Sequence, residues 1–180
     1  LTDLDPSLTV LSVDGVGAYD FVRRQAMLSK QQRTPVARDA IPFTHLSYDH
    51  ASEYLWENDD GSTTTISQAE EGEQGDPLMP ALFALGQHDA LDYAASQLLP
   101  GEKLFAFLDD LYIIATRLRA RAAFDVVADA VQQQTGVRTH LGKLKVWCKA
   151  GGEAPPDIAQ LCPIAWTASE PDTHNGIKVL

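Results

Sequence analysis

Two adjacent aspartates inside an apolar segment constrain this chain more than any other feature. The segment 105–114 reads Phe-Ala-Phe-Leu-Asp-Asp-Leu-Tyr-Ile-Ile, and its aromatic and β-branched residues favour short buried strands on either side of Asp109 and Asp110. Ionised carboxylates beside a core need a partner, and the segment contains no Lys or Arg. A metal ion bound at the edge of the sheet would supply that partner, and a solvated Asp-Asp turn is the alternative.

A third aspartate extends the pair into a set. The segment 8–17 reads Leu-Thr-Val-Leu-Ser-Val-Asp-Gly-Val-Gly, a β-branched run that reaches Asp14 and then breaks into glycines. This pattern is typical of a strand whose last side chain faces a site. Three aspartates at strand ends can converge, and hard cations such as Mg²⁺ bind carboxylate oxygens together with substrate phosphates. Two such ions are suited to in-line phosphoryl transfer.

Four segments of the chain carry motifs. Residues 14–20 read Asp-Gly-Val-Gly-Ala-Tyr-Asp, and residues 73–83 read Glu-Gln-Gly-Asp-Pro-Leu-Met-Pro-Ala-Leu-Phe. Residues 107–110 read Phe-Leu-Asp-Asp, and residues 140–143 read His-Leu-Gly-Lys. In order and spacing, these segments resemble the four palm motifs of reverse transcriptases, closest to those of non-LTR retrotransposons. The match covers nearly the whole chain.

The resemblance implies a metal centre. Asp14, Asp109 and Asp110 would hold two Mg²⁺ or Mn²⁺ ions, and the backbone carbonyl of Gly15 would be an additional oxygen ligand. In this family the second aspartate of the pair often coordinates less tightly, so Asp110 ranks below the other two. The ions would activate the primer 3′-hydroxyl and neutralise the triphosphate.

The resemblance also implies residues that contact the nucleotide. Tyr19 would stand against the sugar and exclude a 2′-hydroxyl, which favours deoxynucleotides; a half-buried aromatic residue is the alternative. Gln74 and Gly75 would line the incoming dNTP and the template base, because glycine permits close backbone approach. A plain loop before a helix is the alternative for these two.

Lys143 would neutralise or protonate the leaving pyrophosphate. Here the chain departs from the family, because His140 stands where an Asn is usual and Leu144 where a Thr is usual. A surface lysine is therefore the alternative for Lys143.

The charge of the chain opposes a nucleic-acid partner. The formal net charge is −11, whereas phosphate contacts come mainly from Lys and Arg. The basic residues nevertheless gather near the motifs, either as solvated faces or as nucleic-acid contacts. They are Arg23, Arg24, Lys30, Arg33 and Arg38; Arg117, Arg119 and Arg121; and Lys143, Lys145 and Lys149. In the resembling family, much of the template and primer contact comes from fingers and thumb that flank the palm.

Local patterns predict an α+β fold in one domain, a small antiparallel sheet with helices packed on one face. The resemblance implies a polymerase palm over residues 1–180, with most of the fingers and thumb absent and a longer polypeptide around it. No segment suits a membrane span, and the two cysteines indicate a reducing, intracellular location, cytoplasmic or nuclear. The expected strands are 8–14, 137–147 in two pieces around Gly142, and 177–180, with hairpins at 53–68 and 105–114; the expected helices are 21–33, 36–48 interrupted at Pro42, 78–99 and 118–134.

These features predict an RNA-directed DNA polymerase palm of a retrotransposon, which extends a primer with dNTPs. Its expected partners are an RNA template, a DNA primer, dNTPs, flanking fingers and thumb, and an endonuclease domain of the same polyprotein. A decayed or repurposed palm without activity is one alternative. An acidic interaction domain whose aspartates bind cations or cap turns is another.

Overall fold

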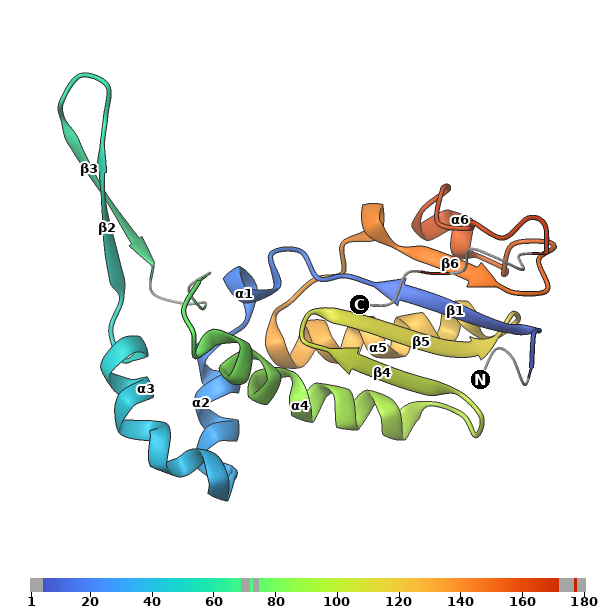
Figure 1. The fold of residues 1–180 in the computed structure, drawn as a ribbon, viewed down its shortest axis with the longest axis horizontal. Coiled ribbons are helices and arrows are strands. Elements are labelled where there is room, and N and C mark those ends of the chain that lie inside the picture. The colour runs from blue at the N-terminus through green and yellow to red at the C-terminus, as the bar shows by residue number, and fades with distance from the viewer. Residues whose placement is uncertain (1–4, 69–71, 73–74, 172–176, 178–180) are drawn as a thin grey trace.

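A four-stranded antiparallel sheet is the centre of the fold (Figure 1). The computed structural model describes residues 5–68, 72, 75–171 and 177. The central strand β1 pairs with β5 on one side and with β6 on the other. The strand predicted at 8–14 and the hairpin predicted at 105–114 are thus confirmed. In sheet order, the strands are β4 (Lys103–Phe107), β5 (Asp110–Thr116), β1 (Leu8–Val13) and β6 (Lys145–Cys148).

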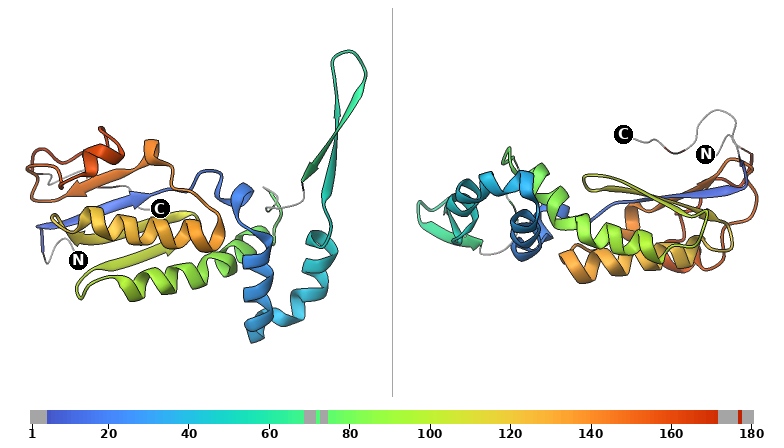
Figure 2. Two further views of the ribbon diagram at one scale, coloured as in Figure 1. Left: turned by 180° about the vertical axis from the view of Figure 1, so that it is seen from behind. Right: turned by 90° about the horizontal axis from the view of Figure 1, so that it is seen from below.

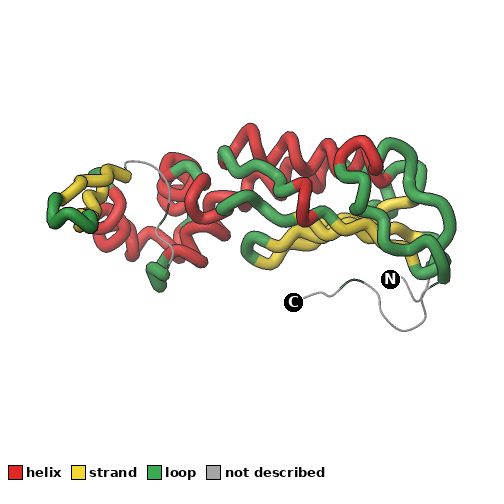
Figure 3. The backbone as a smooth tube through the Cα atoms, turned by 90° about the horizontal axis from the view of Figure 1, so that it is seen from above, coloured by secondary structure: helices red, strands yellow, loops and turns green. Residues whose placement is uncertain are grey.

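Two helices cover one face of this sheet, α4 (Met79–Gln97) and α5 (Ala120–Thr135) (Figures 2 and 3). Small side chains on both helices are fully buried, which lets their backbones approach the apolar side chains of the sheet closely. Gly136 ends α5 with a left-handed backbone, φ 86°. The structure therefore confirms an α+β fold with helices on one face. The core includes Leu11, Ile113 and Val146 from the sheet and Ala90, Ala94, Ala120, Ala123 and Val127 from the helices.

The opposite face of the sheet is only partly covered. Side chains alternate between the two faces of a strand, so Ser12, Tyr112 and Phe105 form one cross-strand row on this face. Phe105 is 48% exposed. At the far end of this face, part of the sheet is covered by a small buried cluster of Val10, Ile114, Trp147 and Ala168. The end that carries the aspartates remains accessible.

Two helices replace the single helix expected at 21–33, and that prediction is wrong in this respect. α1 (Ala18–Phe21) ends at Val22, which is extended and fully buried, and α2 (Arg24–Arg33) begins two residues later. The chain breaks there because the Arg23 N–H bonds Thr135 O at the end of α5, at 2.8 Å. One basic residue of this segment does not lie on a solvated face, since Arg24 is 6% exposed and lies over the Tyr48 ring.

The next segment is a 3₁₀ helix, η1 (Pro35–Ala40), followed by α3 (Ile41–Tyr48). Pro42 lies in the first turn of α3 and does not interrupt a helix there, because its missing N–H has no intrahelical partner in that turn. The predicted hairpin is confirmed as β2 (Ser52–Glu57) paired with β3 (Thr63–Gln68). It projects from the end of α3, away from the main sheet (Figure 1).

The region 137–147 forms one strand, where two were predicted. Thr139 makes an isolated bridge to Gly15, a 3₁₀ turn η2 (Leu141–Lys143) follows, and β6 then begins. The His140 N–H bonds the carbonyl of Asp14, and the chain then turns into η2, so a second strand does not form. Beyond β6 lies the short helix α6 (Ile158–Leu161). Apart from Ile177, the strand expected at 177–180 lies outside the described residues, among which no helix is long and apolar enough to cross a membrane.

Candidate active site

Asp14 follows directly after β1 and is held through its backbone. Its carbonyl accepts a hydrogen bond from the His140 N–H at 2.8 Å, so the strand end is tied to the segment that carries the fourth motif. Gly15 makes this approach possible, because a Cβ at this position would lie 2.8 Å from Cγ1 of Val137. The glycine in the motif is thus explained by packing.

Asp109 and Asp110 lie at the β4–β5 turn. Phe107 and Asp110 form the last cross-strand pair, which leaves Leu108 and Asp109 as a two-residue turn. Leu108 has φ 54°, an unusual conformation for a residue with a side chain. This short turn projects Asp109 from the end of the hairpin and keeps Asp110 on the sheet.

The three aspartates act on one another electrostatically. Burial raises the pKa of Asp110, and the negative charges of Asp109 and Asp14 raise it further, whereas Lys143 opposes the rise. Strand β1 is the neighbour of β5, which explains how a residue near position 14 reaches the turn at 109–110. The structure therefore brings the three predicted carboxylates to the same end of the sheet.

Lys143 also lies at this end. Its Nζ is 2.7 Å from Oδ2 of Asp14, and the Lys143 side chain is 60% exposed. The bond to Asp14 raises the pKa of Lys143, with smaller contributions from Asp109 and Asp110. Solvent screens an exposed ion pair of this kind, so Lys143 can leave Asp14 at little cost.

Tyr19 lies in α1 and contacts the first turns of α4. Its ring meets Phe83 edge to face, with ring centroids 4.9 Å apart. Burial raises the pKa of the Tyr19 hydroxyl, and the charge of Asp109 adds to the rise. Tyr19 is therefore near the turn aspartates and is supported from behind by an aromatic side chain.

The second motif is only partly described, since Gln74 lies outside the described residues. Gly75 has φ 94°, which favours glycine, and its α-carbon faces open space. The next residue, Asp76, accepts a hydrogen bond from the Tyr48 hydroxyl and another from the Leu78 N–H at 2.8 Å. Asp76 thus fixes the start of α4 against α3.

The described side chains have the chemistry of a divalent-cation site, although they do not form a closed one. No group of three His, Cys, Asp or Glu residues within the described ranges is close enough to hold a metal ion as the side chains stand. In this arrangement one oxygen of Asp14 is bonded to Lys143. Three carboxylates whose charges repel one another nevertheless suit Mg²⁺ or Mn²⁺, because a hard cation would relieve that repulsion.

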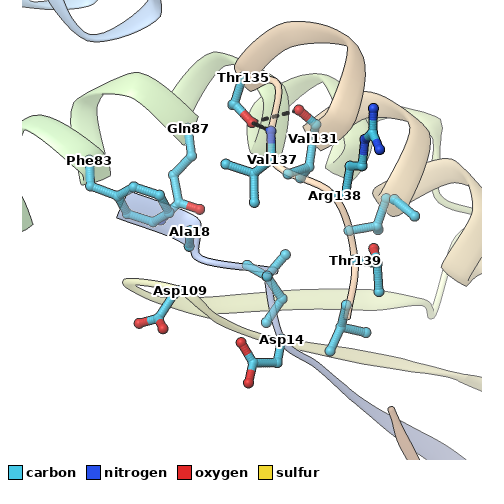
Figure 4. A pocket seen from close by; sticks show the side chains of 15 residues that line it. Asp14, Ala18, Phe83, Gln87, Asp109, Val131, Thr135, Val137, Arg138 and Thr139 are labelled. Carbon is cyan, nitrogen blue, oxygen red and sulfur yellow. Dashed lines mark hydrogen bonds between the residues drawn. The ribbon is translucent and has the colours of Figure 1, made fainter. Parts of the chain in front are cut away.

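A small apolar cavity lies behind the aspartates (Figure 4). The carboxylates of Asp14 and Asp109 lie on the same side of it, and Phe83 and Gln87 of α4 also line it. Sequence reasoning assigned no role to Gln87, since a polar residue in the middle of a helix is ordinarily exposed. Gln87 is 4% exposed, and the burial of this polar side chain distinguishes it in the structure.

Several of the clustered basic residues neutralise acids of the chain itself. Lys30 and Arg33 both bind Asp89 at 2.6 Å, and Arg119 binds the buried Glu102 carboxylate at 2.9 Å. These side chains are therefore engaged within the chain, and they are weaker candidates for phosphate contacts than their positions in the sequence indicated.

Comparisons with known proteins give structural neighbours alone. Neither a protein-family model nor a curated protein sequence matches the chain. Among solved structures, apo telomerase from Candida tropicalis, truncated from its C-terminal domain, aligns with TM-score 0.60 at 14% identity, over 86% of this chain and 34% of that one. Telomerase from Candida albicans, in complex with a TWJ fragment of telomeric RNA, aligns with TM-score 0.61 at 10% identity, over 82% and 28%.

The chain thus spans about a third of the length of these telomerases or less. At such identities the likeness concerns the fold alone. This chain shares its α+β fold with a segment of these telomerases, which is consistent with the polymerase-like architecture that the four motifs imply.

Proposed function

We propose that this chain is the catalytic palm of a retrotransposon reverse transcriptase, an RNA-directed DNA polymerase of the non-LTR type. The observation that carries the proposal is the meeting of Asp14, Asp109 and Asp110 at one accessible end of the sheet, where their charges interact. These three side chains would hold two Mg²⁺ or Mn²⁺ ions. When bound, the ions would supply activation of the primer 3′-hydroxyl and stabilisation of the charge on the triphosphate.

The neighbouring side chains would select and orient the nucleotide. The Tyr19 ring packs edge to face against Phe83, so it can limit the space beside the sugar and exclude a 2′-hydroxyl. The Lys143 side chain is largely exposed, so it can leave Asp14 for the leaving pyrophosphate, to which its ammonium can donate a proton. Gln74 and Gly75 would line the nucleotide and the template base.

The partners of such a palm would be an RNA template, a DNA primer and dNTPs. Solved telomerases with the same fold bind RNA fragments, which supports nucleic acid as the partner class. The net charge of −11 and the internal pairing of several basic residues indicate that most phosphate contacts would come from outside this chain. Flanking fingers, thumb and an endonuclease domain in one intracellular polyprotein would supply them.

The test is primer extension on an RNA template, with Mg²⁺ or Mn²⁺, by the chain within a polypeptide that includes flanking fingers and thumb. Asp109→Asn should abolish extension and leave the melting temperature within a few degrees of the wild type. Asp92→Asn is the matched control, because Asp92 is a 71% exposed aspartate on α4, and it should leave extension unchanged.

Calorimetric titration with Mn²⁺ separates the remaining alternatives. Mn²⁺ binding that is lost in Asp14→Asn, without any extension by the wild type, would assign the chain to the decayed or repurposed palms. Absence of both extension and metal binding would refute the proposal and leave an acidic interaction domain. Extension by Asp109→Asn at the wild-type rate would refute the assignment of the site.

A further inference from the structure

One hydrogen bond joins the interior of α4 to the aspartate turn. Nε2 of Gln87 donates to the backbone carbonyl of Leu108 at 2.6 Å. Gln87 is 4% exposed, so water does not compete for this bond as it would at the surface. No motif of the sequence includes Gln87, and the proposed reaction assigns it no role.

The carbonyl that Gln87 holds belongs to the central peptide of the turn. In a two-residue turn, this peptide lies between the two turn residues, here Leu108 and Asp109. A flip of this peptide plane converts a type II′ turn into a type I′ turn. In type II′, φ is positive at the first turn residue alone, and in type I′ it is positive at both turn residues. The structure has positive φ at Leu108 and not at Asp109, the pattern of type II′.

The choice between the two turns is not made by the local sequence. Type I′ favours Asn-Gly and type II′ favours Gly at its first position, whereas this turn is Leu-Asp. A Leu with positive φ is strained, and contacts from elsewhere must offset that strain. The bond from Gln87 is such a contact, and it also sets the direction of the central carbonyl.

We propose that Gln87 is a positioning residue, which locks the Leu108–Asp109 peptide in one orientation and thereby aims the Asp109 carboxylate toward Asp14. A flipped peptide would change φ of Asp109 and swing its side chain out of line with the other two carboxylates. Gln87 itself does not touch the metal ions or the nucleotide. The link to metal binding rests on the proposed function, whereas the locked peptide does not.

The test compares two buried glutamines. Gln87→Met keeps the volume and removes the donor. Gln31→Met is the matched control, since Gln31 is 2% exposed and its Nε2 bonds Thr44 Oγ1 at 2.9 Å, in the α2–α3 layer. Both variants should lose stability, because each removes a hydrogen-bond donor: Gln87 donates to Leu108 O, and Gln31 donates to Thr44 Oγ1 and to Ala37 O.

Two measurements separate positioning from mere stability. In metal-free ¹⁵N-correlation spectra, the wild type and Gln31→Met should show one sharp Asp109 amide signal, and Gln87→Met should show a doubled or exchange-broadened one. In Mn²⁺ titrations, Gln87→Met should bind about tenfold more weakly than Gln31→Met, as expected for loss of a residue that orients a ligand.

An unchanged single Asp109 signal in Gln87→Met, with Mn²⁺ affinity equal to that of Gln31→Met, would overturn the proposal. If the wild type binds no Mn²⁺ at all, the proposed polymerase function loses its support. The positioning role is then decided by the amide spectra alone.

Discussion

Replacing Gly15 with alanine tests how tightly the first motif is packed against the segment that follows α5. The added Cβ would lie 2.8 Å from Cγ1 of Val137 and 3.1 Å from Cβ of Ala18, and neither neighbour has a flexible end that can yield. Overpacking of this kind costs about 1–3 kcal/mol. The reduced freedom of the unfolded chain returns about 0.4–1 kcal/mol. We therefore expect Gly15→Ala to lower the free energy of unfolding by about 1–2 kcal/mol.

The double variant with Val137→Ala isolates the cause. Val137→Ala alone should cost about 1.6 kcal/mol, the transfer free energy of its buried methyl groups. Val137→Ala removes the atom that clashes with the new Cβ, so the double variant should be no less stable than Val137→Ala alone. The two substitutions should therefore show a coupling free energy of about 1–2 kcal/mol. Urea denaturation at constant m-value measures each free energy. Additive effects, or a Gly15→Ala variant as stable as the wild type, would show that the close approach to Val137 does not explain this glycine.

Three further predictions concern charge and hydrogen bonding. Because burial, with the charges of neighbouring carboxylates, raises the pKa of Asp110 above its value in the unfolded chain, the fold loses stability as pH rises from the unfolded-state pKa through the folded-state pKa. Asp110→Asn should therefore raise the melting temperature at pH 7 without metal, and an unchanged or lower value would contradict this. Lys30 lowers the pKa of Asp89 below its value in the unfolded chain. The ion pair therefore stabilises the fold at pH values above the unfolded-state pKa of Asp89. This stabilisation is lost as the pH falls through the folded-state pKa. Asp89→Asn should cost under about 1 kcal/mol at pH 7, since the carboxylate is 37% exposed, and should make no difference in acid melts once Asp89 is protonated. Tyr48→Phe should cost about 1.5–3 kcal/mol in urea denaturation, because it removes a hydrogen bond to the Asp76 carboxylate; a loss below about 0.5 kcal/mol would contradict that contact.

The parts of the fold that the sequence predicted are those encoded by local pattern. The β-branched run before Asp14 predicts β1, and the turn signal at 58–61 predicts the β2–β3 hairpin, because each depends on residues adjacent in sequence. The break at Val22 was missed because its cause, the Arg23 bond to Thr135, joins residues far apart along the chain.

The candidate site divides in the same way. Its carboxylates could be named from the sequence, since charge beside apolar strands is conspicuous at Asp109 and Asp110. The ion pair of Lys143 with Asp14, and the buried amide of Gln87, depend on tertiary packing. Neither has a signature in local composition, and only a fold places them.

The position of β1 between β5 and β6 also bears on how the chain folds. Leu8 pairs with Thr116, about a hundred residues away, so the sheet forms only after a long loop has closed. Helices α4 and α5 need only local contacts to begin forming, so we expect them to form before β1 pairs with β5. Because the aspartates come from β1 and from the β4–β5 turn, the carboxylate cluster and its electrostatic cost arise only once β1 has paired with β5. On this pathway, the repulsion among the carboxylates speeds unfolding and leaves the rate of folding nearly unchanged.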